Sequence, residues 1–224
     1  MDEGDGQLAT SASVYFPTSV FKYKQEIYIA DAGNYRVRKT DRNGMISTIA
    51  GNGDDGYNGD GILATKASLH PHFIYVHNDQ IYISDIFNYS IRKIDQNGII
   101  TTIAGTGECG YNGDGQLAIH AQLDDPSGIC VDVDSQIYIT DSRNHCIRKI
   151  DQNGIISTIA GTGEKGYSGD VPFDFKKYPH IGPRKKPKIK PFPHAYHDVI
   201  IYCNDFNSTT WTEYEPLTKK TKFN

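Results

Sequence analysis

The feature that most restricts the fold of this chain is a repeat of about 55 residues, which occurs three times. A Gly-Asp-Gly tripeptide recurs at residues 4–6, 59–61 and 113–115. Two stretches are nearly identical, since residues 91–114 and 147–170 differ at only three positions. A unit this short cannot bury its own apolar surface, so repeated units must stack on their neighbours. We therefore expect a row of similar units.

Each copy holds four short segments that have the composition and the period of β-strands. Isoleucine and tyrosine alternate in the second segment, and β-branched residues dominate the fourth. No segment shows the 3.6-residue apolar period of an amphipathic helix. Each copy is therefore expected to form a four-stranded antiparallel meander. The expected strands, in chain order, are 19–23, 26–31, 36–41 and 45–51; 73–77, 80–85, 90–95 and 99–105; and 128–133, 136–141, 146–151 and 155–161.

Turn residues recur between these segments. An Asn-Gly pair joins the third segment to the fourth, and it favours a tight hairpin because both residues tolerate positive φ. An aspartate ends the second segment and an asparagine follows it, where their side chains can bond the local backbone. We expect each aspartate to cap this turn and to pair with an arginine of the third segment, Arg36, Arg92 or Arg148. The repeated structural positions are Asp31, Asp85, Asp141, Asn34, Asn88, Asn144, Gly44, Gly98 and Gly154.

These residues resemble a known repeat family. The NHL repeat is similar to the stretch IYIADAGNYRVRKTDRNGMISTIAGNG (27–53), and the longer NHL repeats of teneurin-like and bacterial propellers resemble IAGTGECGYNGDGQLA (103–118). The resemblance covers residues 4–170 and implies an all-β fold, a β-propeller built from four-stranded antiparallel blades. The three expected blades span about 4–58, 59–112 and 113–170.

Three blades leave the ring incomplete, because propellers close with roughly four to eight. Three arrangements would supply the rest. The chain can be a truncated fragment of a larger multidomain NHL protein, which is the reading we favour. Two chains can pair as a homodimer with six blades. Alternatively, residues 171–224 have the length of one repeat and can form a diverged blade.

The composition of the chain changes near residue 170. Residues 1–170 carry 13 Lys and Arg against 22 Asp and Glu, whereas residues 171–224 carry 10 against 5. Proline and basic residues are interspersed after this point, and such a sequence cannot pack a core. We therefore expect a Pro- and Lys-rich linker over 171–196. Residues 197–224 are expected to be a diverged β segment that starts another module, and their opening HDVIIYC weakly resembles the first strand of a BTB/POZ domain.

Motifs of catalysis and metal binding are absent from the sequence. There is no GxSxG, HExxH or GxxxxGK[ST], and the four cysteines have no paired spacing. His70, His72, His120 and His145 fall at different positions of the repeat. We expect a protein that is not an enzyme and that has no cofactor and no bound metal. Since some NHL-like propellers are lyases or lactonases with metal ligands from several blades, the alternative is a metal-dependent lyase or hydrolase.

One face of the expected blades gathers long loops. Successive turns of a meander alternate between its two ends, so the turns after the second strands share a face with the long connections between blades. Tyrosines among acidic residues on such loops suit a protein or peptide partner, preferably a basic one, and the acidic charge disfavours nucleic acid. The alternative is that the acids only keep the loops solvated. The expected binding residues are Tyr57, Tyr111, Tyr167, Asp55, Asp60, Glu108, Asp114 and Glu164.

The N-terminus does not resemble a targeting signal. The first ten residues, MDEGDGQLAT, are acidic and lack the apolar stretch of a signal peptide. No run approaches the ~18 apolar residues of a membrane-spanning helix. We therefore expect a cytoplasmic protein.

Overall fold

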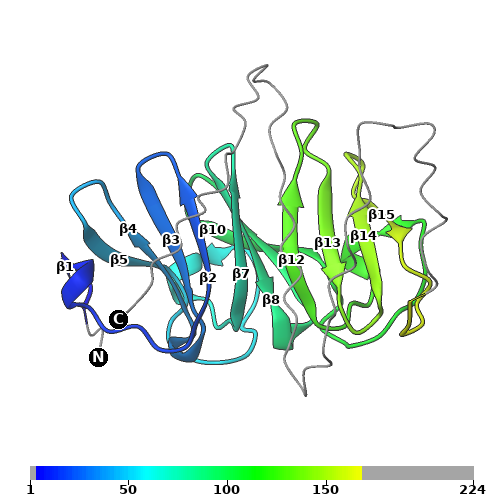
Figure 1. Cartoon of the computed structure of the whole chain (residues 1–224), viewed down its shortest axis with the longest axis horizontal. Helices are drawn as coiled ribbons and strands as arrows, with labels where there is room; N and C mark the ends of the chain where they lie inside the picture. Colours follow the sequence, from blue (N-terminus) through cyan, green and yellow to red (C-terminus); the bar gives the residue numbers. More distant parts are fainter. Residues whose placement is uncertain (1–3, 168–224) are drawn as a thin grey trace, which may run out of the picture.

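The computed structural model describes residues 4–167, which form three antiparallel five-stranded sheets that stand side by side (Figure 1). The linker expected over 171–196 and the segment expected over 197–224 lie outside the described residues. The first sheet contains β1 (Gln7–Leu8), β2 (Pro17–Tyr23), β3 (Glu26–Asp31), β4 (Arg36–Thr40) and β5 (Met45–Ala50). The second contains β6 (Ile62–Leu63), β7 (Pro71–His77), β8 (Gln80–Asp85), β9 (Ser90–Ile94) and β10 (Ile99–Ala104). The third contains β11 (Gln116–Leu117), β12 (Pro126–Val131), β13 (Ile137–Asp141), β14 (Cys146–Ile150) and β15 (Ile155–Ala160).

Each sheet has the strand order of a propeller blade. In the second sheet the order is β6-β10-β9-β8-β7, and the other two sheets repeat it. The first long strands, β2, β7 and β12, contact one another in turn and form the inner side of the arc. The all-β propeller fold is therefore confirmed, and the ring is not closed within the described residues. Short 3-10 turns connect the strands, at η1 (Ala9–Ser11), η2 (Ala32–Asn34), η3 (Ala64–Lys66), η4 (Ile86–Asn88) and η5 (Ala118–His120).

The four predicted strands of every repeat are confirmed, but each sheet also has a fifth strand that was not predicted. This strand is two residues long and pairs with the outer strand of its sheet, as in the register Ile62 to Ile100. The connection that leaves β5 therefore joins the outer edge of the second sheet before it crosses to the inner strand β7. Two residues are too few to show the alternation that identifies a strand in a sequence.

Two apolar clusters fill the space between the sheets. The cluster between the first and second sheets includes Tyr28, Val37 and Ala50 from one side and Ile74 and Ile83 from the other, all at most 6% exposed. We call the side of a sheet that packs on the blade before it the preceding face, and the opposite side the following face. Burying an isoleucine side chain stabilises a fold by about 1.5–3 kcal/mol, so these faces hold the blades together.

The second cluster repeats this arrangement one blade further along the chain. Tyr82, Ile91 and Ala104 on the following face of the second sheet pack against Ile129 and Ile139 on the preceding face of the third. The same repeat positions therefore make both interfaces between blades.

The predicted Asn-Gly hairpins are present, with one difference in backbone conformation. Gly44, Gly98 and Gly154 take φ values of 78°, 75° and 77°, but the asparagines before them do not have positive φ. Instead, Asp41 Oδ1 accepts hydrogen bonds from the backbone N–H groups of Asn43 and Met45. The Met45 N–H is the largest influence that holds the pKa of Asp41 below its usual range. The aspartate at the start of the hairpin therefore stabilises the turn together with the glycine, whereas the asparagine does not adopt the positive φ that was expected.

Candidate functional site

A buried arginine lies at the centre of each blade, between two aspartates. In the second blade, Arg92 Nη1 lies 3.4 Å from Asp85 Oδ2, and Arg92 Nη2 lies 2.8 Å from Asp60 Oδ1. The Arg92 and Asp85 side chains are fully buried. Asp85 comes from the same blade, whereas Asp60 belongs to the Gly-Asp-Gly of the incoming connection. The ion pair therefore fixes this connection to the sheet.

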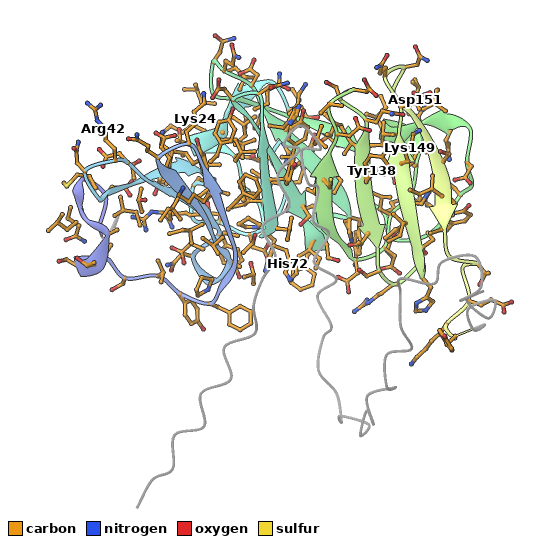
Figure 2. All side chains as sticks on the ribbon, turned by 45° about the horizontal axis from the view of Figure 1, so that its top comes forward. Lys24, Arg42, His72, Tyr138, Lys149 and Asp151 are labelled. Atoms are coloured by element: carbon orange, nitrogen blue, oxygen red, sulfur yellow. The ribbon has the colours of Figure 1, made fainter. Side chains whose placement is uncertain are left out.

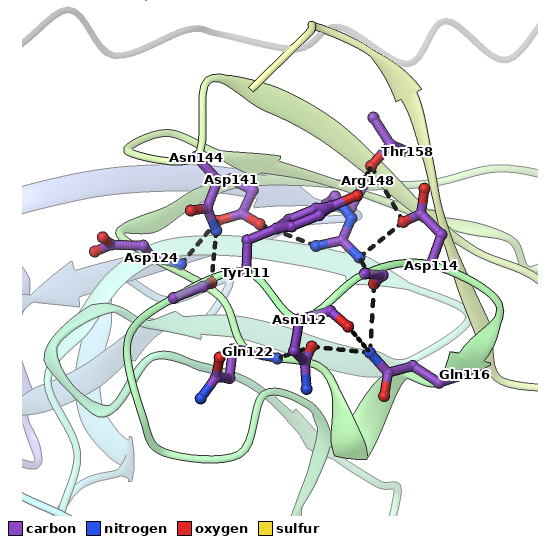
Figure 3. Close-up of polar contacts among 12 residues, drawn as sticks. Tyr111, Asn112, Asp114, Gln116, Gln122, Asp124, Asp141, Asn144, Arg148 and Thr158 are labelled. Atoms are coloured by element: carbon purple, nitrogen blue, oxygen red, sulfur yellow. Dashed lines mark hydrogen bonds and ion pairs between the residues drawn. The ribbon is translucent and has the colours of Figure 1, made fainter. Parts of the chain in front are cut away.

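The third blade repeats the arrangement with Arg148, Asp141 and Asp114 (Figure 3). In the first blade, Arg38 lies 3.6 Å from Asp31 and 2.7 Å from Asp5. The prediction that Arg36 pairs with Asp31 was wrong, because Arg38 lies between Asp31 and Asp5. Arg36 lies two residues earlier, at the start of β4, and donates to the backbone oxygens of Asn34 and Asn52.

We call these arginines and their paired aspartates the framework. The repeated asparagines extend it. Asn88 Nδ2 donates to Asp85 Oδ1 at 2.8 Å and to the backbone oxygen of Gly56, in the connection from the preceding blade, at 2.8 Å. Asn144 makes the same bonds to Asp141 and Gly110. Asn34 donates to both oxygens of Asp31. Asn88 and Asn144 therefore hold the long loops onto the second and third blades.

Burial affects the pKa of the carboxylates that pair with these arginines. It raises the pKa of Asp85 and that of Asp141 above the ordinary range. The backbone N–H of His70, the Asn88 amide and the Arg92 guanidinium act on Asp85 in the opposite direction. Each carboxylate therefore depends on its donors to remain an acceptor in an apolar setting.

Two of the predicted tyrosines cover the framework arginines. The Tyr57 ring lies 4.8 Å from the Arg92 guanidinium, and the Tyr111 ring lies 4.7 Å from that of Arg148. Both rings are about half exposed. Tyr57 and Tyr111 therefore have a packing role in addition to any contact with a partner.

The structure distributes the eight predicted binding residues over several places. Tyr57 and Asp60 line an open groove of about 530 Å³ beside the second blade, and Tyr111 and Glu164 line one of about 290 Å³ beside the third. Asp60 and Asp114 both accept from framework arginines. Asp55 lies 3.1 Å from His70 Nδ1, Glu108 accepts from Gln122 at 3.3 Å, and Tyr167 is 82% exposed.

A larger cavity of about 630 Å³ lies where the inner ends of all three blades meet. One of its residues, His72, is at the edge opposite to the hairpins of Lys24 and Asp151 in Figure 2, on the side of the long loops. This volume is typical of a ligand site. The cavity is lined by Phe16, Pro17, Thr18, Ala32, His70, His72, Ile86, Phe87, Asp125, Ser127, Ser142 and Arg143.

The residues of this cavity differ from blade to blade, although the surrounding framework is the same. The position after the first proline is Thr18, His72 or Ser127, and the position after the framework aspartate is Ala32, Ile86 or Ser142. A residue that every blade needs for packing should be the same in each copy. Differences at matched positions favour a role that is specific to this cavity.

Aromatic side chains stand at the mouth of the cavity. Phe16 is 72% exposed and Phe87 is 58% exposed. The His70 ring contacts the Phe87 ring edge to face, with 4.3 Å between their centroids. Phe16 also has a φ of 48°, in the left-handed region that bulky residues rarely adopt. Residues with such a strained backbone cluster at functional sites.

The opposite wall of the cavity is polar. Ser127 Oγ lies 2.7 Å from Ser142 Oγ and 2.7 Å from Thr140 Oγ1. Arg143 Nε lies 3.2 Å from Asp125 Oδ2. The cavity thus offers hydroxyl groups, a carboxylate and a guanidinium across from aromatic rings.

This cavity was not predicted from the sequence. His70 and His72 fall at different positions of the repeat, but this difference alone does not connect them with Phe16, Phe87 or Arg143. The signal was present in a column-by-column comparison of the three copies, at the positions beside the first proline and the framework aspartate. Within residues 4–167, no three His, Cys, Asp or Glu side chains are grouped so that they could hold a metal ion. The same part of the chain has no helix that is long and apolar enough to span a membrane.

Known proteins share this repeat. The family model for the teneurin NHL domain matches residues 106–174. The protein SUPPRESSOR OF QUENCHING 1, chloroplastic, of Arabidopsis thaliana is 32% identical over 159 residues, which cover 66% of this chain and 15% of that protein. NHL repeat-containing protein 2 of Gallus gallus is 36% identical over 98 residues, 43% of this chain and 13% of that protein. The chain therefore spans only a small part of the length of these curated relatives.

A solved structure supports the fold. A structural genomics protein of unknown function from Bacteroides thetaiotaomicron superimposes with a TM-score of 0.52 and 24% identity, over 65% of this chain and 36% of that chain. At this level of identity the likeness concerns the fold alone. The sequence matches show repeats of the NHL type and support an NHL-repeat family for this chain, with the β-propeller fold that the structure has.

Proposed function

We propose that the protein is a non-catalytic scaffold that binds a protein or peptide through its loop face. The observation that carries this proposal is the cavity at the inner ends of the blades. All three blades contribute to it, and they do so with side chains that differ at matched repeat positions. A rigid framework with a variable cavity suits recognition of a specific partner.

The charges around the cavity favour a basic segment of the partner. Asp55 contacts His70 at the rim, and Asp124 and Asp125 both lie within 4.0 Å of Arg143. Two carboxylates thus lie beside one guanidinium, and a third lies beside His70. The exposed rings of Phe16 and Phe87 offer a surface on which a lysine or arginine side chain can stack. A cationic side chain between these rings and the carboxylates would gain from both contacts.

The test is a binding measurement with an arrayed set of peptides rich in Lys and Arg, beside matched peptides in which these residues are alanine or glutamate. The wild-type chain is expected to retain a subset of the basic peptides. Phe87→Ala and Asp125→Asn are each expected to weaken the retained peptides about tenfold, which corresponds to about 1.4 kcal/mol. Fluorescence anisotropy with the best peptide gives the affinities.

The matched control is Val133→Ala. Val133 is 73% exposed and lies in the turn between β12 and β13, at the edge opposite to the cavity. This variant should bind as the wild type does. The proposal fails if no basic peptide is preferred, or if Phe87→Ala and Asp125→Asn leave the affinity unchanged while circular dichroism shows native folds.

A further inference from the structure

The outer blades each have one face that no other blade covers within the described residues. On the following face of the third blade, Tyr138 and Ile147 are partly exposed and Ala160 is exposed. The matching residues of the second blade, Tyr82, Ile91 and Ala104, are at most 5% exposed. Ile159 is 50% exposed as well. This face therefore has the apolar residues that form an interface in the second blade, but here they are exposed.

The preceding face of the first blade shows the same change. Val20 is 70% exposed, whereas Ile74 and Ile129 at the same position of β7 and β12 are fully buried. Val14 is 44% exposed, and the matching Leu69 of the second blade is fully buried. The two ends of the arc are therefore one following face and one preceding face. This is the pair of surfaces that meets at both interfaces inside the chain.

The two end faces also differ from the inner faces in complementary ways. The preceding face of the first blade has Lys22 where the second blade has Val76. The following face of the third blade has Asp132 where the first blade has Tyr23. Tyr23 and Val76 belong to one cluster at the first interface. At the second interface the matching residues are His77 and Val131. At the two ends they are a lysine and an aspartate, one on each face, and Asp132 Oδ2 also accepts from the Tyr138 hydroxyl at 3.0 Å.

We infer that a second copy of this chain covers both end faces. The following face of the third blade in each copy packs on the preceding face of the first blade in the other. The two contacts are related by a twofold axis and close a ring of six blades, which is within the usual range for propellers. This inference is independent of the proposed function, since it concerns the ends of the arc and not the cavity.

The first experiment is the native mass of the full chain by light scattering after size exclusion, over a wide range of protein concentration. A closed dimer has about twice the chain mass of 24.9 kDa and forms no larger species. A monomer at all concentrations, or an open-ended series of oligomers, would overturn the inference.

Two variants test which surfaces meet. Val20→Glu and Ile159→Glu each introduce a charge at a side chain that is exposed in the single chain, so the fold of the monomer should be kept. Each should raise the dissociation constant of the dimer about tenfold or more, with unchanged circular dichroism. The control is Leu63→Glu, because Leu63 is 53% exposed at the outer edge of the middle blade. It should remain a dimer, and a dimer of normal affinity for both end-face variants would count against the inference.

A mixture of the two variants distinguishes this dimer from other dimers. When Val20→Glu chains are mixed with Ile159→Glu chains, one of the two contacts in a mixed dimer has neither substitution. The mixture should therefore contain more dimer than either variant alone. If mixing restores no dimer, the two end faces do not meet and the inference is wrong.

Discussion

The framework around the buried arginines and the cavity at the inner ends of the blades lie close together but follow opposite rules. The framework uses the same residues in each blade, as Arg92 and Arg148 show with their two aspartates. The cavity uses a different residue at each matched position, as Thr18, His72 and Ser127 show. Since both regions arise from one repeat, the comparison separates the residues that build the fold from those that are available for recognition.

The largest expected difference is between two arginines, one from each region. Arg92→Ala removes the partner of the buried Asp85, and leaving a buried charge unpaired costs about 3–5 kcal/mol of unfolding free energy. Arg143→Ala removes a side chain that is 60% exposed in the cavity wall, and it should change stability by no more than about 0.5 kcal/mol. Urea denaturation of both variants measures this. Equal losses would mean that the cavity is part of the framework.

Two glycines in the connection after β10 test which of its residues are packed against the sheet. Gly105 has a φ of +97°, and a Cβ added there would lie 2.2 Å from the backbone oxygen of Tyr89. Gly107 has a φ of +87°, but a Cβ there would meet no atom within 4 Å. Gly105→Ala is therefore expected to cost about 2–4 kcal/mol, and Gly107→Ala about 1 kcal/mol, from the strained backbone alone. Thermal unfolding should rank them in this order, and a larger loss for Gly107→Ala would contradict the packing.

Tyr111 tests whether the framework and the recognition surface are separate, because it was predicted to bind a partner and its ring also covers Arg148. Tyr111→Ala should lower stability by about 1 kcal/mol through the loss of the ring over the guanidinium. Tyr111→Phe keeps the ring and should be close to the wild type. Urea denaturation gives the stability, and peptide binding gives the second readout. If Tyr111→Ala weakens binding as much as Phe87→Ala while its stability is normal, the tyrosine belongs to the recognition surface.

The smallest expected effect concerns pH and a hairpin at the edge opposite to the cavity. Asp95 Oδ1 accepts from the N–H groups of Ile99 and Asn97, and the Ile99 N–H is the main reason that the pKa of Asp95 is lowered. A carboxyl with a lowered pKa in the folded state stabilises the fold above its unfolded pKa of about 3.8, and this contribution is lost as the pH falls through the folded value. Asp95→Asn should therefore show a slightly shallower loss of stability between about pH 5 and about pH 2 than the wild type. An identical pH profile would mean that the hairpin carboxylate does not contribute.

The sequence was sufficient for the strands, the hairpins and most of the framework, since these depend on local patterns that occur three times. The alternation in QIYISD and QIYITD and the glycines at 44, 98 and 154 each specify local backbone geometry. Repetition then indicates that the local geometry is part of the architecture. The fold of residues 4–167 could therefore be predicted from few residues.

The cavity could not be predicted in the same way, because it depends on how the blades are placed relative to one another. Phe16 and Phe87 are 71 positions apart in the chain, and no pattern in either segment shows that their side chains line one cavity. The partner of Asp31 was also missed, although alignment of RVRKTD with SIRKID and CIRKID matches Arg38, and not Arg36, to Arg92 and Arg148. Contacts between blades, unlike contacts within them, need the three-dimensional arrangement.

The short outermost strands have a consequence for the solubility of the molecule. The exposed edge of a sheet can recruit the backbone of another chain and start aggregation. In the second blade, Gly61 N–H donates to the Ile100 oxygen at 2.9 Å, and Asp60 Oδ1 accepts from the Thr102 N–H at 2.9 Å. The backbone groups that β10 would present to a foreign strand are thus already occupied by the connection from the preceding blade. In each copy of the repeat, the two-residue strand therefore covers part of the outer sheet edge and limits edge-to-edge pairing with another chain.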